Sequence, residues 1–267
     1  MLWLERKRIV AAYNNDYIGA YLDNSGGTGT VTVNYSTFNG NADDGLYVLS
    51  SHAISLKNIT TLDNGWDGAF LENDNALTAQ PVTITSVNNF NFNGATGLVV
   101  LSRGAITAGN VTAMYNSGYN GAYLDNCDYD DTSGWCLTPG SYAVTLKGSN
   151  NFSNNGYDGL EAWASGAITA NNLTADHNGR NLAFDSVNLL GYEYGAGVYL
   201  DNFGAPSAKP IAITGTNLLT RNGATGLWLN SYGTVTVNNP TANDNGLDVN
   251  CFLGSYYWTC DGMHVDW

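Results

Sequence analysis

A six-residue motif that begins with glycine recurs along the whole chain in two alternating forms. One form reads Gly-Ala-Tyr-Leu-Asp-Asn, as in residues 19–24, and the other reads Gly-Leu-Tyr-Val-Leu-Ser, as in residues 45–50. Nine copies follow one another, and we call the stretch from one repeat glycine to the next a coil, numbered 1 to 9. Such repeats are typical of solenoids, in which each repeat packs only on its neighbours. We therefore expect a single domain over residues 1–267.

Three short strands are predicted in each coil. Positions +1 and +3 after each repeat glycine are apolar in all nine copies, so positions +2 and +4 are expected to face outward. A second strand follows, as in the Val-Thr-Val of residues 31–33, and a third begins after an asparagine. This pattern predicts an all-β parallel β-helix, a solenoid of about nine three-strand coils.

The asparagines that precede the third strand are expected to form a stacked ladder at one turn. They recur at equivalent positions, and Asn tolerates the left-handed conformation that a tight turn needs. Several also match the N-x-S/T glycosylation pattern, but the repeat requires Asn there in any host. The ladder is predicted at Asn58, Asn110, Asn172 and Asn239.

The charge balance excludes one class of partner. Charged residues are 12% of the chain and the net charge is −14, whereas phosphate backbones need a basic surface. Nucleic acid is therefore not expected as a partner. An anionic polymer such as pectate would also be repelled unless calcium bridged it, so neutral ligands and cations fit the charge better.

The four cysteines form two short pairs, Cys127 with Cys136 and Cys251 with Cys260. Local pairs inside loop-like sequence predict two disulfides and an oxidising compartment, and hence an extracellular or cell-surface location. A four-cysteine zinc site is the alternative, which the absence of CxxC spacing disfavours.

The two ends of the chain give further expectations. Residues 1–8 lack the apolar core of a signal peptide, and no stretch approaches the length of a membrane span. The chain starts within a coil and stops directly after a first strand, which would expose strand edges. We expect a segment of a longer extracellular protein with further domains attached, or end-to-end self-association.

This repeat texture resembles the right-handed parallel β-helix repeat proteins of the pectin-lyase-like superfamily. The resemblance covers nearly the whole chain but is specific for the fold only. It implies glycans and an extracellular setting, because members include lyases, glycoside hydrolases, sugar-binding modules and adhesins. The segment His-Asn-Gly-Arg at residues 177–180 is only faintly similar to a polygalacturonase Gly-His-Gly segment. No Asp-Asp pair stands in a matching strand, and the basic cluster of a pectate lyase is missing. No particular reaction follows.

The outward face of the first strand is the predicted binding surface. Position +2 is mostly aromatic, and position +4 is acidic in every odd coil and in no even coil. Acids would then recur about every 9.6 Å, comparable to a two-sugar repeat of an extended glycan. Aromatic faces and carboxylates together are typical of sugar binding. The expected ligand-binding residues are Tyr21, Tyr47, Phe70, Glu72, Tyr123, Trp163, Tyr199, Trp228 and, from a disulfide-closed loop, Trp135.

Glu161 breaks the aromatic pattern at position +2 and motivates an enzyme hypothesis. Its diagonal neighbours Asp125 and Asp201 would lie roughly 8 Å away. Carboxylates about 6.5–9.5 Å apart suit inverting glycoside hydrolysis, with Glu161 as the acid and either aspartate as the base. The alternative is that Glu161 contacts sugar or solvent without catalysis.

Two further interpretations stay open. The acidic stretch beside Asp125, formed by Asp128, Asp130 and Asp131, is a weak candidate for structural calcium; no other cofactor and no transition-metal site is expected. Because aromatic and Asp-Asn residues are also ordinary strand and turn chemistry, a purely structural or adhesin role is the third functional class.

Overall fold

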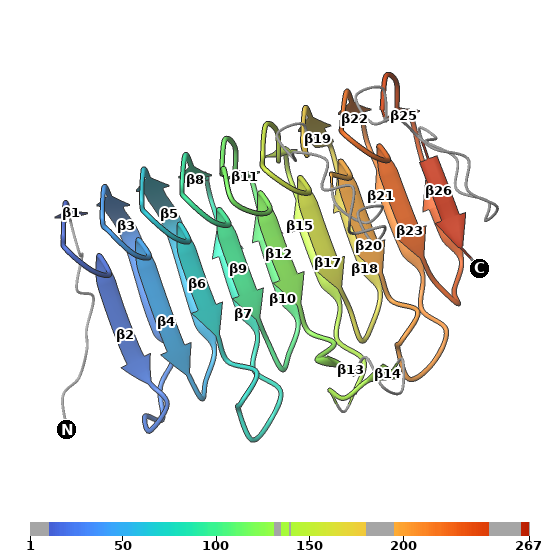
Figure 1. The fold of residues 1–267 in the computed structure, drawn as a ribbon. Helices are drawn as coiled ribbons and strands as arrows, with labels where there is room; N and C mark the ends of the chain where they lie inside the picture. The colour runs from blue at the N-terminus through green and yellow to red at the C-terminus, as the bar shows by residue number, and fades with distance from the viewer. Residues whose placement is uncertain (1–10, 131–134, 139, 180–194, 246–262, 267) are drawn as a thin grey trace.

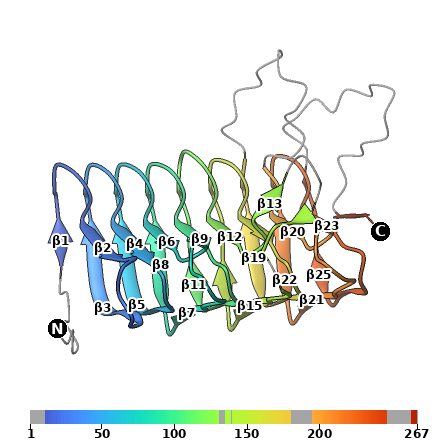
Figure 2. The same ribbon diagram turned by 90° about the horizontal axis from the view of Figure 1, so that it is seen from below.

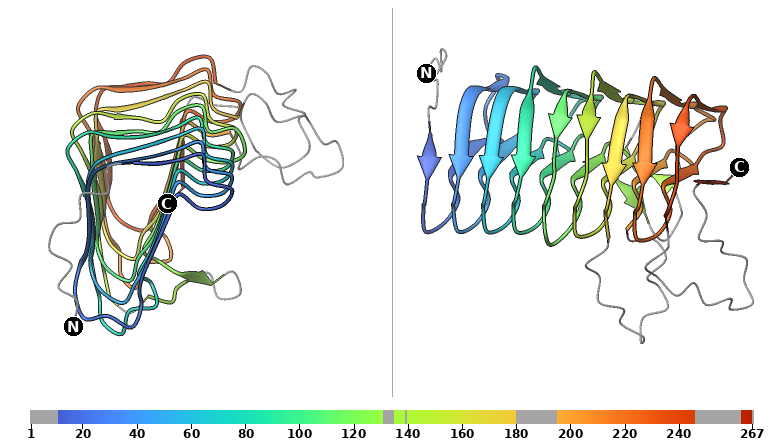
Figure 3. Two further views of the ribbon diagram at one scale, coloured as in Figure 1. Left: turned by 90° about the vertical axis from the view of Figure 1, so that its left-hand side faces the viewer. Right: turned by 90° about the horizontal axis from the view of Figure 1, so that it is seen from above.

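The chain forms a right-handed parallel β-solenoid of about eight turns (Figure 1). This computed structural model describes residues 11–130, 135–138, 140–179, 195–245 and 263–266, and of residues 129, 130 and 263–266 it describes the backbone. Successive coils stack in register along one axis, as the views from below and above show (Figures 2 and 3). The predicted all-β parallel β-helix is confirmed.

The first strands of the coils form one parallel nine-stranded sheet, which we call the front sheet. Each strand pairs in register with the equivalent residues of the next coil, so Tyr21 opposes Tyr47 and Tyr123 opposes Glu161. The strands are β2 (Ala20–Asn24), β4 (Leu46–Ser50), β6 (Ala69–Glu72), β9 (Leu98–Leu101), β12 (Ala122–Asp125), β17 (Leu160–Trp163), β20 (Val198–Asp201), β23 (Leu227–Asn230) and β26 (Met263–Asp266).

The second and third strands form a fifteen-stranded sheet, the back sheet, which bends around the core. The sheet has two limbs, one formed by the second strands and the other by the third strands. The strands β3 (Val31–Asn39) and β5 (Ile54–Leu62) are long enough to run through both limbs. The second-strand limb continues through β7 (Val82–Thr85), β10 (Ile106–Gly109), β15 (Val144–Lys147), β18 (Ile168–Asn171), β21 (Ile211–Thr214) and β24 (Val235–Val237). The third-strand limb contains β1 (Ala12–Tyr13), β8 (Asn88–Asn91), β11 (Val111–Thr112), β16 (Asn150–Asn151), β19 (Leu173–Asp176), β22 (Asn217–Thr220) and β25 (Pro240–Thr241).

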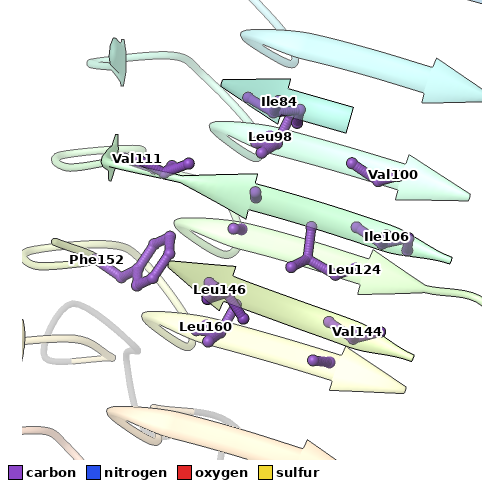
Figure 4. Packing of buried hydrophobic residues seen from close by; sticks show 14 of the residues in the cluster. Ile84, Leu98, Val100, Ile106, Val111, Leu124, Val144, Leu146, Phe152 and Leu160 are labelled. Atoms are coloured by element: carbon purple, nitrogen blue, oxygen red, sulfur yellow. The ribbon is translucent and has the colours of Figure 1, made fainter. Parts of the chain in front are cut away.

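The core is a column of apolar side chains enclosed by the two sheets (Figure 4). Positions +1 and +3 of the front strands point into it, as Leu98 and Val100 do with 1% and 0% exposure. On the third strands, Phe38 and Phe90 are fully buried with the smaller Thr61 in register between them. Large and small side chains thus alternate from coil to coil, which keeps the interior closely packed.

The predicted asparagine ladder exists, but at a different turn. Asn58, Asn110, Asn172 and Asn239 do have positive φ, between 48° and 53°, as expected. They occur only in even coils, however, so they lie about 9.6 Å apart, beyond the reach of one amide for the next. Ser86, Gly148 and Gly215 hold the same corner in odd coils. The prediction that these four side chains stack on one another was therefore wrong, but most of them do bond neighbouring backbone, as Asn172 does by donating to Gly148 O at 3.3 Å.

The actual ladder is formed by one asparagine in the turn that follows each third strand, four or five residues before the repeat glycine in all coils except those preceded by the insertions after Asn178 and Asn245. Each side-chain amide donates to the carbonyl oxygen of the equivalent asparagine in the next coil, at 2.7–3.0 Å. Most of the members are buried, and their amides also donate to backbone carbonyls, as Asn116 does to Phe90. The ladder comprises Asn15, Asn41, Asn64, Asn93, Asn116, Asn155, Asn178, Asn222 and Asn245.

Odd and even coils differ in the turn that follows the front strand. In odd coils an asparagine at position +5 donates across a long loop, as Asn73 does to Gln80 O and Asn202 to Lys209 O, both at 3.1 Å. In even coils a serine closes a short turn, as Ser102 Oγ does by accepting from the Gly104 backbone. The longest described loop contains a hairpin of β13 (Tyr129–Asp130) and β14 (Trp135–Cys136), which projects from the solenoid (Figure 3).

Candidate functional site

The +2 residues form a continuous row on the outward face of the front sheet. Strand pairing places them directly opposite one another from coil to coil. Most are half-buried; Tyr21 is 53% exposed and Val99 only 8% exposed. The row consists of Tyr21, Tyr47, Phe70, Val99, Tyr123, Glu161, Tyr199 and Trp228, and position +2 of coil 9 lies outside the described side chains.

The aromatic rings on this face, which include Trp163 at position +4, form two runs. In coils 1 to 3, Tyr21 is tilted by 33° against Tyr47 at 5.2 Å, whereas Tyr47 and Phe70 stack nearly parallel, with centroids 4.9 Å apart and an interplanar angle of 12°. In coils 6 to 8, Trp163, Tyr199 and Trp228 are tilted by 40° and 42° at 5.4 and 5.9 Å. The stacked rings cover one another's faces and present edges outward, whereas the tilted rings leave parts of their faces accessible.

The acids at position +4 have a local structural role. Asp23, Asp125 and Asp201 each accept the backbone N–H two residues ahead, at 2.6–2.8 Å. Such Asx turns begin the long loops, and long loops occur in odd coils. In coil 3, Glu72 instead accepts from the side chain of Asn75. The two-coil recurrence of acids, interpreted above as a match to a glycan, is thus explained by loop capping.

Glu161 is held by two nitrogen donors. Trp163 donates its indole N–H to Oε1 at 2.7 Å, and Asn120 donates its amide to Oε2 at 2.7 Å. Asn120 is itself oriented because its Oδ1 accepts from the Asp158 backbone at 3.1 Å. Donors to both oxygens fix the direction of the carboxylate. The site therefore presents a pre-oriented hydrogen-bond acceptor among aromatic rings.

Asn120 was not among the residues predicted from sequence. It occupies the position before the repeat glycine, where Asp44, Asp67 and Asp158 stand in other coils. Two sequence features could have pointed to Asn120. It stands where those coils have aspartate, and the turn of residues 116–121 is one residue longer than the equivalent turns of most coils. Its contact with Glu161 joins the turn before Gly121, at the end of coil 4, to the front strand of coil 6, and required knowledge of the coil register.

The two proposed partners of Glu161 differ in their surroundings. Burial raises the pKa of Asp125, although backbone N–H groups of Cys127 and Asp128 lower it in part. Asp201 is only 4% exposed and accepts from Tyr199 at 3.1 Å and from Asn230 at 2.9 Å. In the register, Trp163 lies between the two aspartates. Of the pair, Asp125 is the more accessible to a water molecule.

Trp135 lies at the edge of the front sheet rather than on it. The Cys127–Cys136 disulfide closes its hairpin, and the Cys136 N–H donates to Gly204 O in coil 7 at 3.0 Å. The hairpin of coil 5 therefore reaches over later coils (Figure 2). One predicted disulfide is confirmed; Cys251 and Cys260 lie outside the described residues.

The calcium prediction stays open. Asp125 Oδ1 accepts from the backbone of Cys127 and Asp128, and the side chains of Asp130 and Asp131 lie outside the described part. Among the described side chains, no three His, Cys, Asp or Glu residues group in a way that could hold a metal ion.

A buried pair of aspartates borders the N-terminal ends of the front strands. Asp44 Oδ1 accepts from the Asp67 backbone at 2.9 Å, and Asp67 Oδ1 accepts from the Thr96 backbone at 2.7 Å. Burial raises the pKa of Asp44 to about 6 and that of Asp67 to about 7, with Asp43 adding repulsion in both cases. These groups titrate near neutral pH, which the sequence did not reveal.

The chain matches no family model, no curated protein and no solved structure. The fold confirms the parallel β-helix part of the resemblance, and membership of the pectin-lyase-like superfamily stays a prediction. No helix among the described residues has the length and apolar character that crossing a membrane requires.

Proposed function

We propose that this protein binds a neutral polysaccharide on the outward face of the front sheet. The observation that carries the proposal is Glu161, whose carboxylate is fixed by Trp163 and Asn120 at the head of a run of tilted aromatic rings. Ring faces pack on the C–H surfaces of sugars, and an oriented carboxylate accepts hydrogen bonds from hydroxyl groups.

The electrostatics favour an uncharged ligand. The net charge of −14 and the acids around the front sheet would repel uronic-acid polymers. Neutral β-linked chains carry hydroxyl donors for Glu161 without that repulsion. An extracellular or cell-surface location is part of the proposal, and the Cys127–Cys136 disulfide supports it because such bonds persist in oxidising compartments.

The test measures binding to a panel of neutral and acidic polysaccharides by affinity electrophoresis. The panel includes β-glucan, xylan, mannan and pectate. Tyr199→Ala should weaken retention about tenfold. Tyr115→Ala is the matched control, because Tyr115 is also an accessible stacked ring, 4.8 Å from Phe92, but lies on another corner of the coil. Equal retention of both variants, or no retention of the wild type, would refute the proposal.

Glycoside hydrolysis is the second candidate, and the register that sets Asp125 diagonal to Glu161 on neighbouring strands is the observation in its favour. Burial raises the pKa of Asp125, which suits an acid better than the base expected of it. Released oligosaccharides from the wild type, lost in Glu161→Gln, would establish an enzyme. Retention without products in both proteins would leave a binding module. A protein that neither retains nor cleaves any polysaccharide would favour the structural or adhesin class.

A further inference from the structure

We infer that the glycan lies across coils 6 to 8, in the direction of the strands, and that one end packs against Tyr232 and Trp135 at the edge of the front sheet. This inference rests on the proposed function and assigns a direction and an end point to the bound chain. A path along the solenoid axis is the alternative.

The end point is an aromatic cluster assembled from three loops. Tyr232 of coil 8 stacks on Phe203 of coil 7, with centroids 3.8 Å apart at 26°, and Trp135 of the coil 5 hairpin lies 6.2 Å from Tyr232 at 25°. Trp135 and Tyr232 remain 48% and 50% exposed. The Cys127–Cys136 disulfide and the bond from Cys136 to Gly204 hold Trp135 there. Half of a rigid aromatic platform is therefore open to solvent.

A shallow hollow of about 470 Å³ adjoins Tyr232. Apart from Tyr232, only small residues line the hollow, and the hydroxyl of Thr234 is among them. A sugar ring therefore has room to pack against Tyr232. Its lining consists of Ala208, Pro210, Tyr232, Gly233 and Thr234.

The cluster follows directly after the tilted rings on the same coils. Phe203 of coil 7 and Tyr232 of coil 8 come four residues after Tyr199 and Trp228, in the turns that begin where β20 and β23 end. The two residues of each pair are therefore at most about 14 Å apart along the chain. Between these two aromatic ends, Asn230 donates to Asp201 at 2.9 Å and forms a polar centre. Apolar ends around a polar middle suit a short stretch of glycan chain.

The axial path is interrupted. In coil 4, Val99 stands at position +2, where most coils carry an aromatic ring, and it is only 8% exposed. Before this gap, Tyr47 and Phe70 stack at 12° and cover each other's faces. A chain along the axis would therefore lose ring contacts midway, whereas the transverse path keeps them at both ends.

The first experiment compares matched variants by calorimetry with cello-, xylo- and manno-oligosaccharides. Trp135→Ala and Tyr232→Ala should each weaken binding about tenfold. Trp66→Ala and Phe92→Ala are the controls, because these side chains are each 52% exposed and lie in coils 2 and 3, away from the +2 row. Controls that weaken binding as much as the test pair, or a test pair without effect, would overturn the transverse path.

The second experiment needs no variant and so does not depend on the hairpin remaining folded. Affinity of the wild type should stop rising after a few sugar units if the chain crosses the sheet. Affinity that keeps rising with chain length would indicate the axial path. If Tyr199→Ala weakens binding but the transverse results fail, only this inference is wrong; if the wild type binds none of the sugars, the proposed function fails with it.

Discussion

The indole N–H of Trp163 donates to Glu161, two residues earlier on the same strand, at 2.7 Å. Both side chains occur in coil 6, where the repeat would otherwise place an aromatic ring at +2. Residues two apart on a strand share a face, so the pair departs from the repeat together. Glu161 and Trp163 thus depart from the repeat as a hydrogen-bonded pair, and Asn120, directly before the repeat glycine of coil 5, supplies the second donor to Glu161.

Replacing Trp163 by Phe keeps a ring but removes the donor to Glu161. We expect a loss of about 1 kcal/mol in the free energy of unfolding, because one charge-assisted hydrogen bond is removed at a half-buried site. Glycan affinity should fall about tenfold as the carboxylate loses its fixed direction. Urea unfolding and calorimetry measure the two effects, and unchanged affinity would argue against a role for the pair in binding.

Among the turn residues, substitutions in the asparagine ladder should lower the free energy of unfolding most. Asn116→Ala leaves the side-chain amide and the backbone N–H of Asn93 without their shared acceptor and removes the donor to Phe90 O, all buried, and should cost about 3 kcal/mol or more. Asn58→Gly is the control, because glycine adopts the φ of 53° without strain. Urea midpoints that shift equally in the two variants would contradict the assignment of the ladder.

Stability should fall as pH rises through the neutral range. Burial raises the folded-state pKa of Asp44 to about 6 and of Asp67 to about 7, from an ordinary 3.8, so the folded state binds these protons more tightly. Their contribution is full below about pH 4 and is lost as pH rises through 6 and 7. A folded-state pKa that lies one pH unit above the unfolded-state pKa corresponds to about 1.4 kcal/mol at most.

Urea unfolding between pH 5 and 8 tests this expectation. The Asp44→Asn, Asp67→Asn double variant keeps an acceptor oxygen at both positions and should flatten the profile. A variant profile as steep as that of the wild type would assign the pH dependence to other groups.

Reduction of the Cys127–Cys136 disulfide should loosen the hairpin without unfolding the coils. The bridge closes a loop between residues nine apart in sequence, worth about 2–3 kcal/mol in chain entropy, and few core residues depend on it. We expect a change in Trp135 fluorescence with a reductant, while the β-sheet circular dichroism persists. The Trp135→Phe variant is the control, because its fluorescence should not change on reduction if the wild-type change comes from Trp135.

Local patterns were sufficient for the architecture. Alternating apolar residues after each glycine determined which side chains face inward, because strand geometry leaves no other choice. The choice of Asp-Asn or Leu-Ser at the end of the front strand determined a long or a short loop, since each pair makes its bonds within a few residues, as Asp201 does with Phe203. The Cys127–Cys136 pair was also local enough to predict.

What the tertiary structure alone decided are the contacts between coils. Asn120 reaches Glu161 across 41 residues, and Trp135 meets Tyr232 from a loop three coils away. The asparagine ladder was assigned to the wrong turn because sequence spacing does not reveal which polar side chain points into the stack. Loops of different length separate equivalent residues by different numbers of positions, so only the stacked register brings these side chains together. The sequence by itself therefore determined the coil, and the stacking of coils determined the site.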